Sequence, residues 1–598
     1  MLPRALLIAA LATAPLAAQE NLFLHVPDPA SKTRIEAVAL FSRPSPGGFL
    51  PVRITVNNGS DRNGKIALDT VCRTGGFGEQ TTLNSSFSLE APAQQSTRHD
   101  ILVPCATLLS YAGIDGNISV NVRMSGDFGA NSNQLAGSYS ENQPAILLSE
   151  ALFTPNASVL DAQIASGSGG HFSGDTFAGR FDPAQMPEDW RAYAGYDGVG
   201  MTDADWGVLS PGARNALLRW NRLGGQLVIY ALSASTSFAT LGISDSAGGS
   251  REAERSFGSV SIQGIGTDLK LDAPATVDLF GRSSNLPTLV SSLRDDFRGG
   301  WPLKSLFGMQ RYNYALFILI LVAFGVLVGP VNLFVFAKSG RRHRLFITTP
   351  LIALGTSALL VMLIILIDGF GGRGFRVQLM EVRPDNGENS AYILQEQISR
   401  TGILTDKDFV IAEPAAITPV VLESADNQWA RLTDDNWGNG MRYEAEFRDG
   451  KLHVSGDWFL SRSEQGQLVR AVVPTRGRIE ARSTGGTPSL LSTFEFPIQT
   501  LYYRDEAGGY WKAENIEPGK AFTCTSIDTA AAENFAADAA GQLSTRSRMA
   551  LWKGQGDSLA ARPNHFLAFT EAAPGVETYT GIDWKQTRTY ITGPIAKP

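Results

Sequence analysis

Two long apolar runs, residues 314–337 and 345–367, occupy the middle of this 598-residue chain, and neither contains a charged residue. Each run exceeds the ~20 residues that a helix needs to cross the hydrocarbon core of a membrane. The link between them, residues 338–344, contains lysine and arginine but no acidic residue, which is typical of a cytoplasmic loop. The pattern predicts a transmembrane hairpin, with the large regions before and after it on the same, non-cytoplasmic side.

The first 18 residues have the pattern of a secretory signal peptide. Arg4 precedes the apolar run 5–11, and small residues at 12–18 offer cleavage sites. We expect cleavage because the apolar run is too short to form a stable anchor, and an uncleaved anchor would leave the topology unchanged. No cysteine lies near position 19, so a lipid-anchored N-terminus is not expected.

The composition limits the partners and the redox chemistry of the chain. The net charge of −7 is spread thinly and forms no basic stripe, so binding to nucleic acid is not expected. Of the three cysteines, Cys72 and Cys105 both fall in the first predicted domain, and an exported protein can oxidise them to a disulfide. That bridge would close a loop of about 33 residues, worth roughly 3–4 kcal/mol. Two buried thiols are the alternative, and Cys524 is unpaired in either case.

Residues 20–145 and 371–598 both have the patterns of β-structure. Residues 34–41 and 50–56 alternate apolar and polar positions, and turn-forming residues 57–64 follow, which together predict a β-sandwich over 20–145. In the C-terminal region, strands are predicted at 375–382, 468–473 and 500–504, with a hairpin turn at Gly508 and Gly509. We also expect a short helix at 393–401 and a helix or linker at 526–548.

Residues 146–290 instead alternate strands and helices. Apolar strands are predicted at 145–148, 198–201 and 226–231. Between the last two, Ser210 and Pro211 have the pattern of a helix start, and Gly224 and Gly225 that of a helix end. A strand, a capped helix and a second strand predict a βαβ unit in a small parallel sheet. Residues 291–313 then form a juxtamembrane segment.

The middle of the chain also resembles a known fold. Residues 196–203, 209–211 and 220–228 resemble the class I glutamine amidotransferase-like fold. More narrowly, the chain resembles uncharacterised bacterial membrane proteins that place such a domain before a transmembrane segment containing Gly-Pro-Val-Asn, here residues 329–332. The resemblance implies an α/β domain and a location in the bacterial inner membrane.

The residues for amidotransferase chemistry are missing from the sequence. Residues 146–290 contain no cysteine, and the chain has no Gly-x-Ser-x-Gly run that would place a serine nucleophile on a tight turn. The six histidines are far apart, without His-x-x-x-His spacing or a cysteine pair at ligand spacing. The run 166–171 lacks the ending of a phosphate loop and predicts a flexible surface loop. We therefore expect no catalytic, cofactor-binding or metal-binding residues, and no cofactor.

Asp203 and Asp205 form the best acidic cluster. Carboxylates beyond the C-terminal ends of parallel strands could hold a cation or a substrate. The simpler interpretation is that Asp203 caps the following turn and that Asp205 is solvated. We favour the structural interpretation of this pair.

The apolar runs contain a packing signal. Gly325 and Gly329 form a small-x-x-x-small motif, which allows close approach of another helix. Ala353 and Ser357 offer a matching face on the second run, so a tight hairpin is expected. Alternatively, Gly325 and Gly329 could form the contact of a homodimer. Without charged residues inside either run, ion conduction has no support.

Five further residues in or near the apolar runs have predicted roles. Pro330 should kink the first helix unless neighbouring groups recover the lost hydrogen bond. Asn332 lies near the cytoplasmic end, where its amide could reach headgroups or the loop backbone. Trp301, Tyr312 and Tyr314 suit the membrane–water interface on the non-cytoplasmic side, because their rings are amphipathic.

Together, these patterns predict a multidomain α+β membrane protein: a β-sandwich, a non-catalytic amidotransferase-like α/β domain, a transmembrane hairpin and a C-terminal β-rich domain. We expect a binding or scaffolding component of an envelope complex, with the lipid bilayer and other envelope membrane proteins as its partners. The alternatives are an accessory subunit of a transporter, or an envelope enzyme that uses a carboxylate site such as Asp203 and Asp205.

Overall fold

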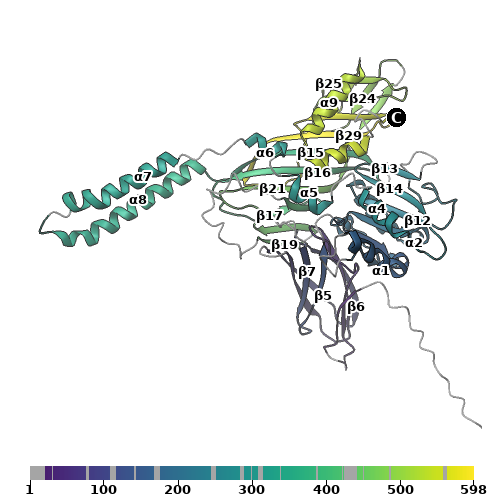
Figure 1. Cartoon of the computed structure of the whole chain (residues 1–598), viewed down its shortest axis with the longest axis horizontal. Coiled ribbons are helices and arrows are strands. Elements are labelled where there is room, and N and C mark those ends of the chain that lie inside the picture. The colour runs from purple at the N-terminus through teal and green to yellow at the C-terminus, as the bar shows by residue number, and fades with distance from the viewer. Residues whose placement is uncertain are drawn as a thin grey trace, which may run out of the picture.

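The computed structural model describes residues 20–597 except 28, 30, 76–79, 108–115, 140–142, 168–175, 244–250, 283–287, 298–299, 308–313, 337–338, 386–387, 421, 423–440, 449, 484–485 and 556–561. Figure 1 shows one large body built mostly of strands, from which a long helical hairpin projects. The predicted signal peptide, residues 1–18, and Tyr312 lie outside the described residues, as does most of the predicted loop 166–171.

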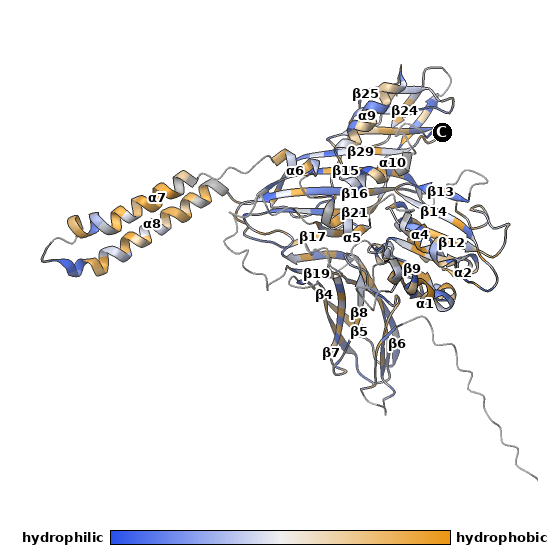
Figure 2. Cartoon of the chain, in the orientation of Figure 1, coloured by the Kyte–Doolittle hydropathy of each residue, from blue (hydrophilic) through white to orange (hydrophobic). Residues whose placement is uncertain are grey.

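The hairpin confirms the predicted pair of apolar helices. The first arm is α7 (Tyr314–Val326), continued by the π-helical η3 (Leu327–Phe336). The second arm is α8 (Leu345–Asp368), preceded by the short η4 (Arg342–Arg344). Mean hydropathies of 2.6 for Ile318–Phe336 and 2.0 for Arg342–Leu363 make both long and apolar enough to cross a membrane. Figure 2 shows apolar residues along both arms and hydrophilic residues at the tip.

The predicted disturbance at Pro330 takes the form of a π-helical stretch. Pro330 lies inside η3 and has no N–H to donate to the carbonyl one turn before it. The regular i to i−4 pattern is therefore interrupted there, and a wider turn accommodates the ring.

The N-terminal region is a sandwich of two sheets whose inner faces belong to one apolar core. The first sheet has the order β1-β2-β3-β6 and consists of β1 (Glu20–His25), β2 (Arg34–Ala39), β3 (Phe49–Asn58) and β6 (Gln95–Pro104). The second contains β4 (Gly64–Gly75), β5 (Gln80–Ala91), β7 (Gly116–Gly126) and β8 (Asn131–Tyr139). Buried and more exposed residues alternate along β4, as the predicted period of two requires.

The second sheet also receives strands from the C-terminal region. These are β17 (Phe409–Ile411), β19 (Arg442–Arg448) and β20 (Lys451–Gly456), in the sheet order β17-β20-β19-β5-β4-β7-β8. β19 runs parallel to β5, with Glu444 opposite Asn84, and Thr82 N donates to the Met441 carbonyl at 2.9 Å. Part of residues 371–598 therefore covers a sheet edge of the sandwich that would otherwise be open.

The middle region confirms the predicted parallel sheet. Its order is β10-β9-β11-β12-β14-β13, from β9 (Ile146–Ser149), β10 (Ala178–Phe181), β11 (Gly198–Thr202), β12 (Gln226–Ala231), β13 (Glu252–Arg255) and β14 (Gly258–Gly264). Only β13 pairs antiparallel among these strands. The helices are α1 (Glu150–Gly167), α2 (Asp203–Val208), α3 (Pro211–Arg222) and α4 (Ala273–Arg282). The predicted cap of α3 is confirmed, since Ser210 Oγ accepts from Ala213 N at 3.1 Å.

Two glycines in β11 allow this sheet to pack closely. A Cβ on Gly198 would lie 2.7 Å from the Phe280 ring of α4, and one on Gly200 would lie 2.7 Å from Leu148 of β9. A larger residue at either position would force these neighbours apart.

The C-terminal region builds a nine-stranded sheet, here called the central sheet, in the order β18-β21-β16-β15-β29-β28-β24-β25-β27. Its strands are β15 (Gly372–Asp385), β16 (Glu388–Thr401), β18 (Ala415–Val420), β21 (Glu464–Thr475), β24 (Ile498–Arg504), β25 (Tyr510–Ile516), β27 (Thr525–Ile527), β28 (His565–Thr570) and β29 (Ile582–Pro594). The helix expected at 393–401 is wrong, because this segment belongs to β16 and pairs with β15 on one side and β21 on the other.

The remaining elements surround this sheet. They are η1 (Pro183–Gln185), η2 (Trp190–Tyr193), α5 (Leu289–Asp295), α6 (Pro302–Phe307), β22 (Ile479–Ser483), β23 (Ser489–Ser492), β26 (Ala521–Thr523), α9 (Thr529–Gly541) and α10 (Thr545–Gln555). Most of residues 526–548 are helical and belong to α9 and α10. A helix was one of the two structures predicted for this segment, and a linker was the other.

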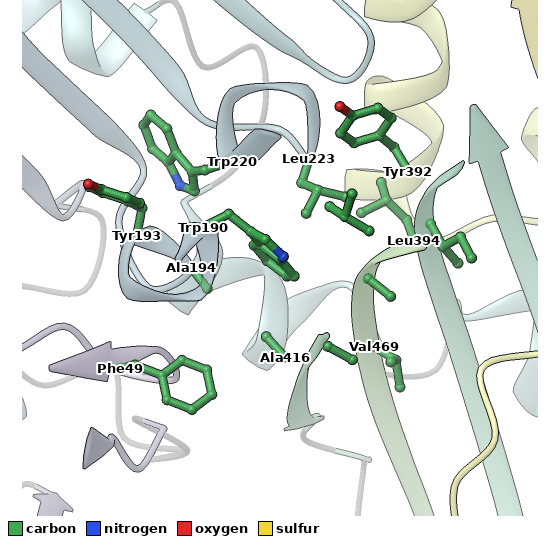
Figure 3. Close-up of a cluster of buried hydrophobic side chains, with 14 of the residues drawn as sticks. Phe49, Trp190, Tyr193, Ala194, Trp220, Leu223, Tyr392, Leu394, Ala416 and Val469 are labelled. Carbon is green, nitrogen blue, oxygen red and sulfur yellow. The ribbon is translucent and has the colours of Figure 1, made fainter. Parts of the chain in front are cut away.

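The three regions share one apolar core, which Figure 3 shows in close-up. Trp190 and Leu223 of the α/β region face Leu394 and Val469 of the central sheet. Phe49 of the sandwich lies on the same side of the central sheet as Trp190. Because all five side chains are buried, separating the regions would expose large apolar surfaces to water. The sandwich, the α/β region and the central sheet therefore form one packed body.

Candidate functional site

The most distinctive site of the described residues is a group of buried polar side chains where the juxtamembrane segment meets all the surrounding elements. We call it the polar junction and define it by Asp197, Asp296, Trp301, Glu396, Arg470, Ser544 and Arg546. The segment contains α5 and α6 and leads directly into the first arm of the hairpin. The contacts of this junction determine how firmly the hairpin is joined to the body.

Asp197 fixes the start of the segment to the α/β region. It follows η2 and precedes β11, and its Oδ1 accepts from Leu289 N at 2.9 Å. Its Oδ2 accepts from Ala145 N at 3.0 Å, next to β9. Burial raises the pKa of the Asp197 carboxyl, and the nearby Arg546 guanidinium opposes this shift. Asp197 therefore acts as a clasp between the first turn of α5 and the parallel sheet.

Glu396 holds the end of the segment to the central sheet. Its Oε2 accepts from Trp301 Nε1 at 2.8 Å, and its Oε1 accepts from the Ser544 hydroxyl at 2.5 Å. Ser544 N also donates to both carboxylate oxygens at 3.1 Å. Burial raises the pKa of Glu396, while the bonds from Ser544, Ser547 and Trp301 lower it. One carboxylate in β16 thus joins the juxtamembrane segment to the turn between α9 and α10.

Two buried arginines belong to the junction. The backbone N of Arg546 donates to Asp296 Oδ2 at 3.0 Å, and Arg470 Nη1 donates to the Ala194 carbonyl at 2.6 Å. Burial lowers the pKa of the Arg546 guanidinium, and the nearby Asp197 and Asp296 carboxylates oppose this shift. Burial lowers the pKa of Arg470 to about 9, and the Arg546 cation lowers it further, whereas Asp197 raises it. Removing one charge from such a set would leave another buried without compensation, which is strongly destabilising.

Trp301 is a correction to the sequence prediction. An indole at the membrane interface should be partly accessible, but Trp301 is only 1% exposed and packs edge-to-face on Phe297, with ring centroids 4.9 Å apart. Its N–H needs a buried acceptor, and Glu396 supplies it. Sequence reasoning missed Glu396 and Ser544, because no local pattern links them to Trp301.

The second arm of the hairpin is joined to the same sheet. α8 ends at Asp368, and β15 begins at Gly372. Between them, Gly371 has φ +74° and donates its N–H to the Ile403 carbonyl at 3.0 Å. Ile403 N in turn donates to the Gly369 carbonyl at 3.0 Å. This short connection fixes the exit of α8 against the segment that follows β16.

The two arms contact each other through a polar group rather than through glycines. Asn332 is fully buried, and its Nδ2 donates to Thr349 Oγ1 at 2.9 Å. Its Oδ1 accepts from Thr348 Oγ1 at 2.6 Å. The prediction that this amide reaches headgroups or the loop backbone is therefore wrong, because the second arm satisfies it.

The glycine motif does not form the predicted contact. Apart from the neighbouring residues and backbone of its own helix, no described atom lies within 4 Å of a Cβ added to Gly325 or Gly329. The expected packing of these glycines on Ala353 and Ser357 is therefore wrong. Their face of the helix is open in a single chain.

Asp203 and Asp205 lie together at the end of β11, as predicted, but both have structural partners. Thr202 Oγ1 accepts from Asp205 N at 3.0 Å, and Asp205 Oδ2 accepts from Thr202 N at 3.0 Å, which completes a capping box. The cap is thus made with Asp205, where Asp203 was expected. Asp203 accepts from Thr236 Oγ1 at 2.8 Å and ties the loop after β12. Within the described residues, no group of three His, Cys, Asp or Glu could hold a metal ion.

A small hollow of about 20 Å³ lies where β19 and β20 join the sandwich. Phe49, Tyr443 and Trp458 contribute aromatic walls, and its described lining includes no charged side chain. A space of this size holds about one water molecule, so it leaves no room for a substrate.

Comparison of the sequence with protein-family models finds no match, and comparison with curated proteins finds none either. The resemblance to amidotransferase-like domains therefore stays a prediction.

Proposed function

We propose that this protein is a membrane-anchored scaffolding or binding component of a bacterial envelope complex, without catalytic activity of its own. It resides in the inner membrane, with both large regions outside the cytoplasm. The observation that supports this proposal best is the junction of both hairpin arms with one packed body. Trp301 is held by Glu396 before the first arm, and Gly371 is held by Ile403 after the second.

The orientation follows from the loop between the two arms. Arg341, Arg342 and Arg344 are exposed at the tip of the hairpin, and basic residues in short loops favour the cytoplasmic side. The ends of both arms that join the body then lie on the opposite side. In this proposed orientation, the sandwich, the α/β region and the central sheet lie in the extracytoplasmic space.

A scaffolding role suits a body of this construction better than an enzymatic one. Asp203 and Asp205 are occupied by Thr202 and Thr236, so the enzyme alternative loses its best candidate. Two spans are also too few to form a transport pathway alone. The scaffolding role requires only a large body with an accessible surface, held at the membrane by the hairpin.

The test is site-specific cross-linking on intact membranes. A photo-reactive amino acid at Val208 or Val159, which are 60% and 56% exposed on the α/β region, should give a discrete cross-linked product with another envelope protein. The same amino acid at Lys520, on a distant exposed turn, samples another face of the body. A control chain with the hairpin replaced by an unrelated two-span hairpin should keep any partner that the body binds. Uncross-linked monomer at every position tested on the body would contradict the proposal.

A further inference from the structure

Cys72 and Cys105 come from opposite sheets of the N-terminal sandwich. Cys72 lies in β4, where its neighbours in register are Leu83 of β5 and Val120 of β7. Cys105 directly follows β6 of the facing sheet, and its N–H donates to the Gly48 carbonyl at 2.9 Å. Both side chains are buried, with exposures of 0% for Cys72 and 4% for Cys105.

The two thiols lie next to each other in the gap between the sheets. Ala106 N, one peptide bond beyond Cys105, donates to Cys72 Sγ at 3.2 Å. Two residues further along β4, Thr74 Oγ1 donates to the Thr107 carbonyl at 2.5 Å, so the two segments stay in contact beyond the pair. A hydrogen bond with Cys72 and burial together raise the pKa of the Cys105 thiol. Both cysteines are free thiols in this structure.

We propose that Cys72 and Cys105 are a site of oxidative modification and are joined by an intersheet disulfide in the exported protein. The proposal rests on the extracytoplasmic location proposed above, because thiols persist in the cytoplasm and disulfides form outside it. The bridge joins β4, in the middle of one sheet, to the end of β6 in the other. Cys524 is buried elsewhere, beside Pro488, and takes no part.

The chemistry is an exchange with the disulfide of an extracytoplasmic thiol oxidase. One cysteine, as thiolate, attacks a sulfur of the oxidase disulfide, which breaks that bond and forms a mixed disulfide. The second cysteine, as thiolate, then attacks the first, forming the bond between Sγ of Cys72 and Sγ of Cys105. Two electrons pass to the oxidase, and its two sulfur atoms take up, through the solvent, the two protons lost by Cys72 and Cys105, so that it leaves as a dithiol. Because burial disfavours the thiolate, the exchange occurs before the two sheets close over the pair.

The test counts free thiols in the full-length chain taken from membranes. Protein denatured in a maleimide reagent without reductant should carry one label, on Cys524, and after reduction it should carry three, the number of cysteines in the chain. Cys524→Ala should carry none without reductant. Cys72→Ala should carry two, because Cys105 loses its partner. The last two variants assign the bridge even if one of them folds poorly.

Three labels without reductant on the parent protein would overturn the disulfide. Labelling of an Asp61→Cys variant by an impermeant reagent reports separately whether the sandwich is outside the cytoplasm, since Asp61 is exposed on it. An outside label combined with three free thiols refutes the disulfide alone. An inside label refutes the proposed location, and the disulfide that rests on it fails as well.

Discussion

The indole N–H of Trp301 donates to the carboxylate of Glu396 across 2.8 Å, which ties the segment before the first apolar helix to the middle of the central sheet. The same carboxylate accepts from Ser544, between α9 and α10. A single buried acid therefore holds three parts of the chain that are far apart in sequence. The segment that contains Trp301 is therefore anchored to the body.

Trp301→Phe tests this relationship. The smaller phenyl ring still fills most of the site, but Glu396 loses one donor, so the free energy of unfolding should fall by about 1–3 kcal/mol. Trp511→Phe is the matched control, because Trp511 Nε1 donates to Asp505 Oδ2 at the same 2.8 Å. That bond lies in the less buried β-hairpin of β24 and β25. Denaturant unfolding in detergent measures both variants. Equal losses would mean that the junction bond has no special structural weight.

His565 predicts how stability depends on pH. Burial lowers the pKa of His565 from 6.5 to about 4; the Arg383 cation adds to this shift, and the Pro563 carbonyl opposes it. Between these values the unfolded chain binds more protons than the folded one, so stability rises from pH 4 to pH 6.5 and is fully present above it.

His565→Gln should remove about 1–2 kcal/mol of this pH dependence, allowing for the ring's partial exposure. Unfolding at pH 4.5 and pH 7 gives the comparison, with His99→Gln on the sandwich as the control. An unchanged slope in His565→Gln would show that the ring is not responsible.

Asn332→Leu should loosen the hairpin. The change removes the bonds to Thr348 and Thr349, each worth roughly 0.6 kcal/mol and at most about 1.7 in a membrane. Val335→Leu, at an exposed position of the same helix, is the control. Protease resistance of the loop after extraction should drop only in the Asn332 variant. Gly329→Leu should leave the monomer unchanged, and a drop there would restore the glycine face as the contact between the arms.

Local signals predicted several elements well. Helix α3 begins after Ser210 and ends before Gly224, as expected, because capping depends on neighbouring residues only. The apolar runs likewise predicted α7 and α8 from length and composition alone. The expected βαβ unit followed from these ends and the buried strands between them.

The error at β16 has a non-local cause. Gln395 and Gln397 look like exposed helix positions, but they are buried in a row of amides that crosses three strands. Gln378 donates to Gln395 at 2.7 Å, Gln395 donates to Gln397 at 2.9 Å, and Gln397 donates to Gln467 at 3.1 Å. Only the assembled sheet supplies these partners. The same limit hid the pairing of β19 with β5 and the contact of Trp301 with Glu396.

Asp205→Ala tests the structural interpretation of the acidic pair. Loss of the capping box should cost about 0.5–2 kcal/mol of stability. A metal ion that binds only the folded state raises the unfolding temperature. We expect no such rise for the parent protein with calcium or magnesium, because Asp203 and Asp205 already have structural partners. A metal-dependent stabilisation that disappears in Asp205→Ala would restore the cation site and the enzyme alternative.

The most direct test of the account is the side of the membrane on which each part lies. Single cysteines at Asp61, Lys520 and Ser339 are all exposed and sample the sandwich, the C-terminal region and the hairpin loop. The native cysteines are buried, so the parent protein serves as the blank for an impermeant maleimide. We predict labelling of Asp61→Cys and Lys520→Cys from outside the intact inner membrane, and of Ser339→Cys only after that membrane is disrupted. Labelling of Ser339→Cys from outside, or of only one of the other two, would contradict the proposed topology.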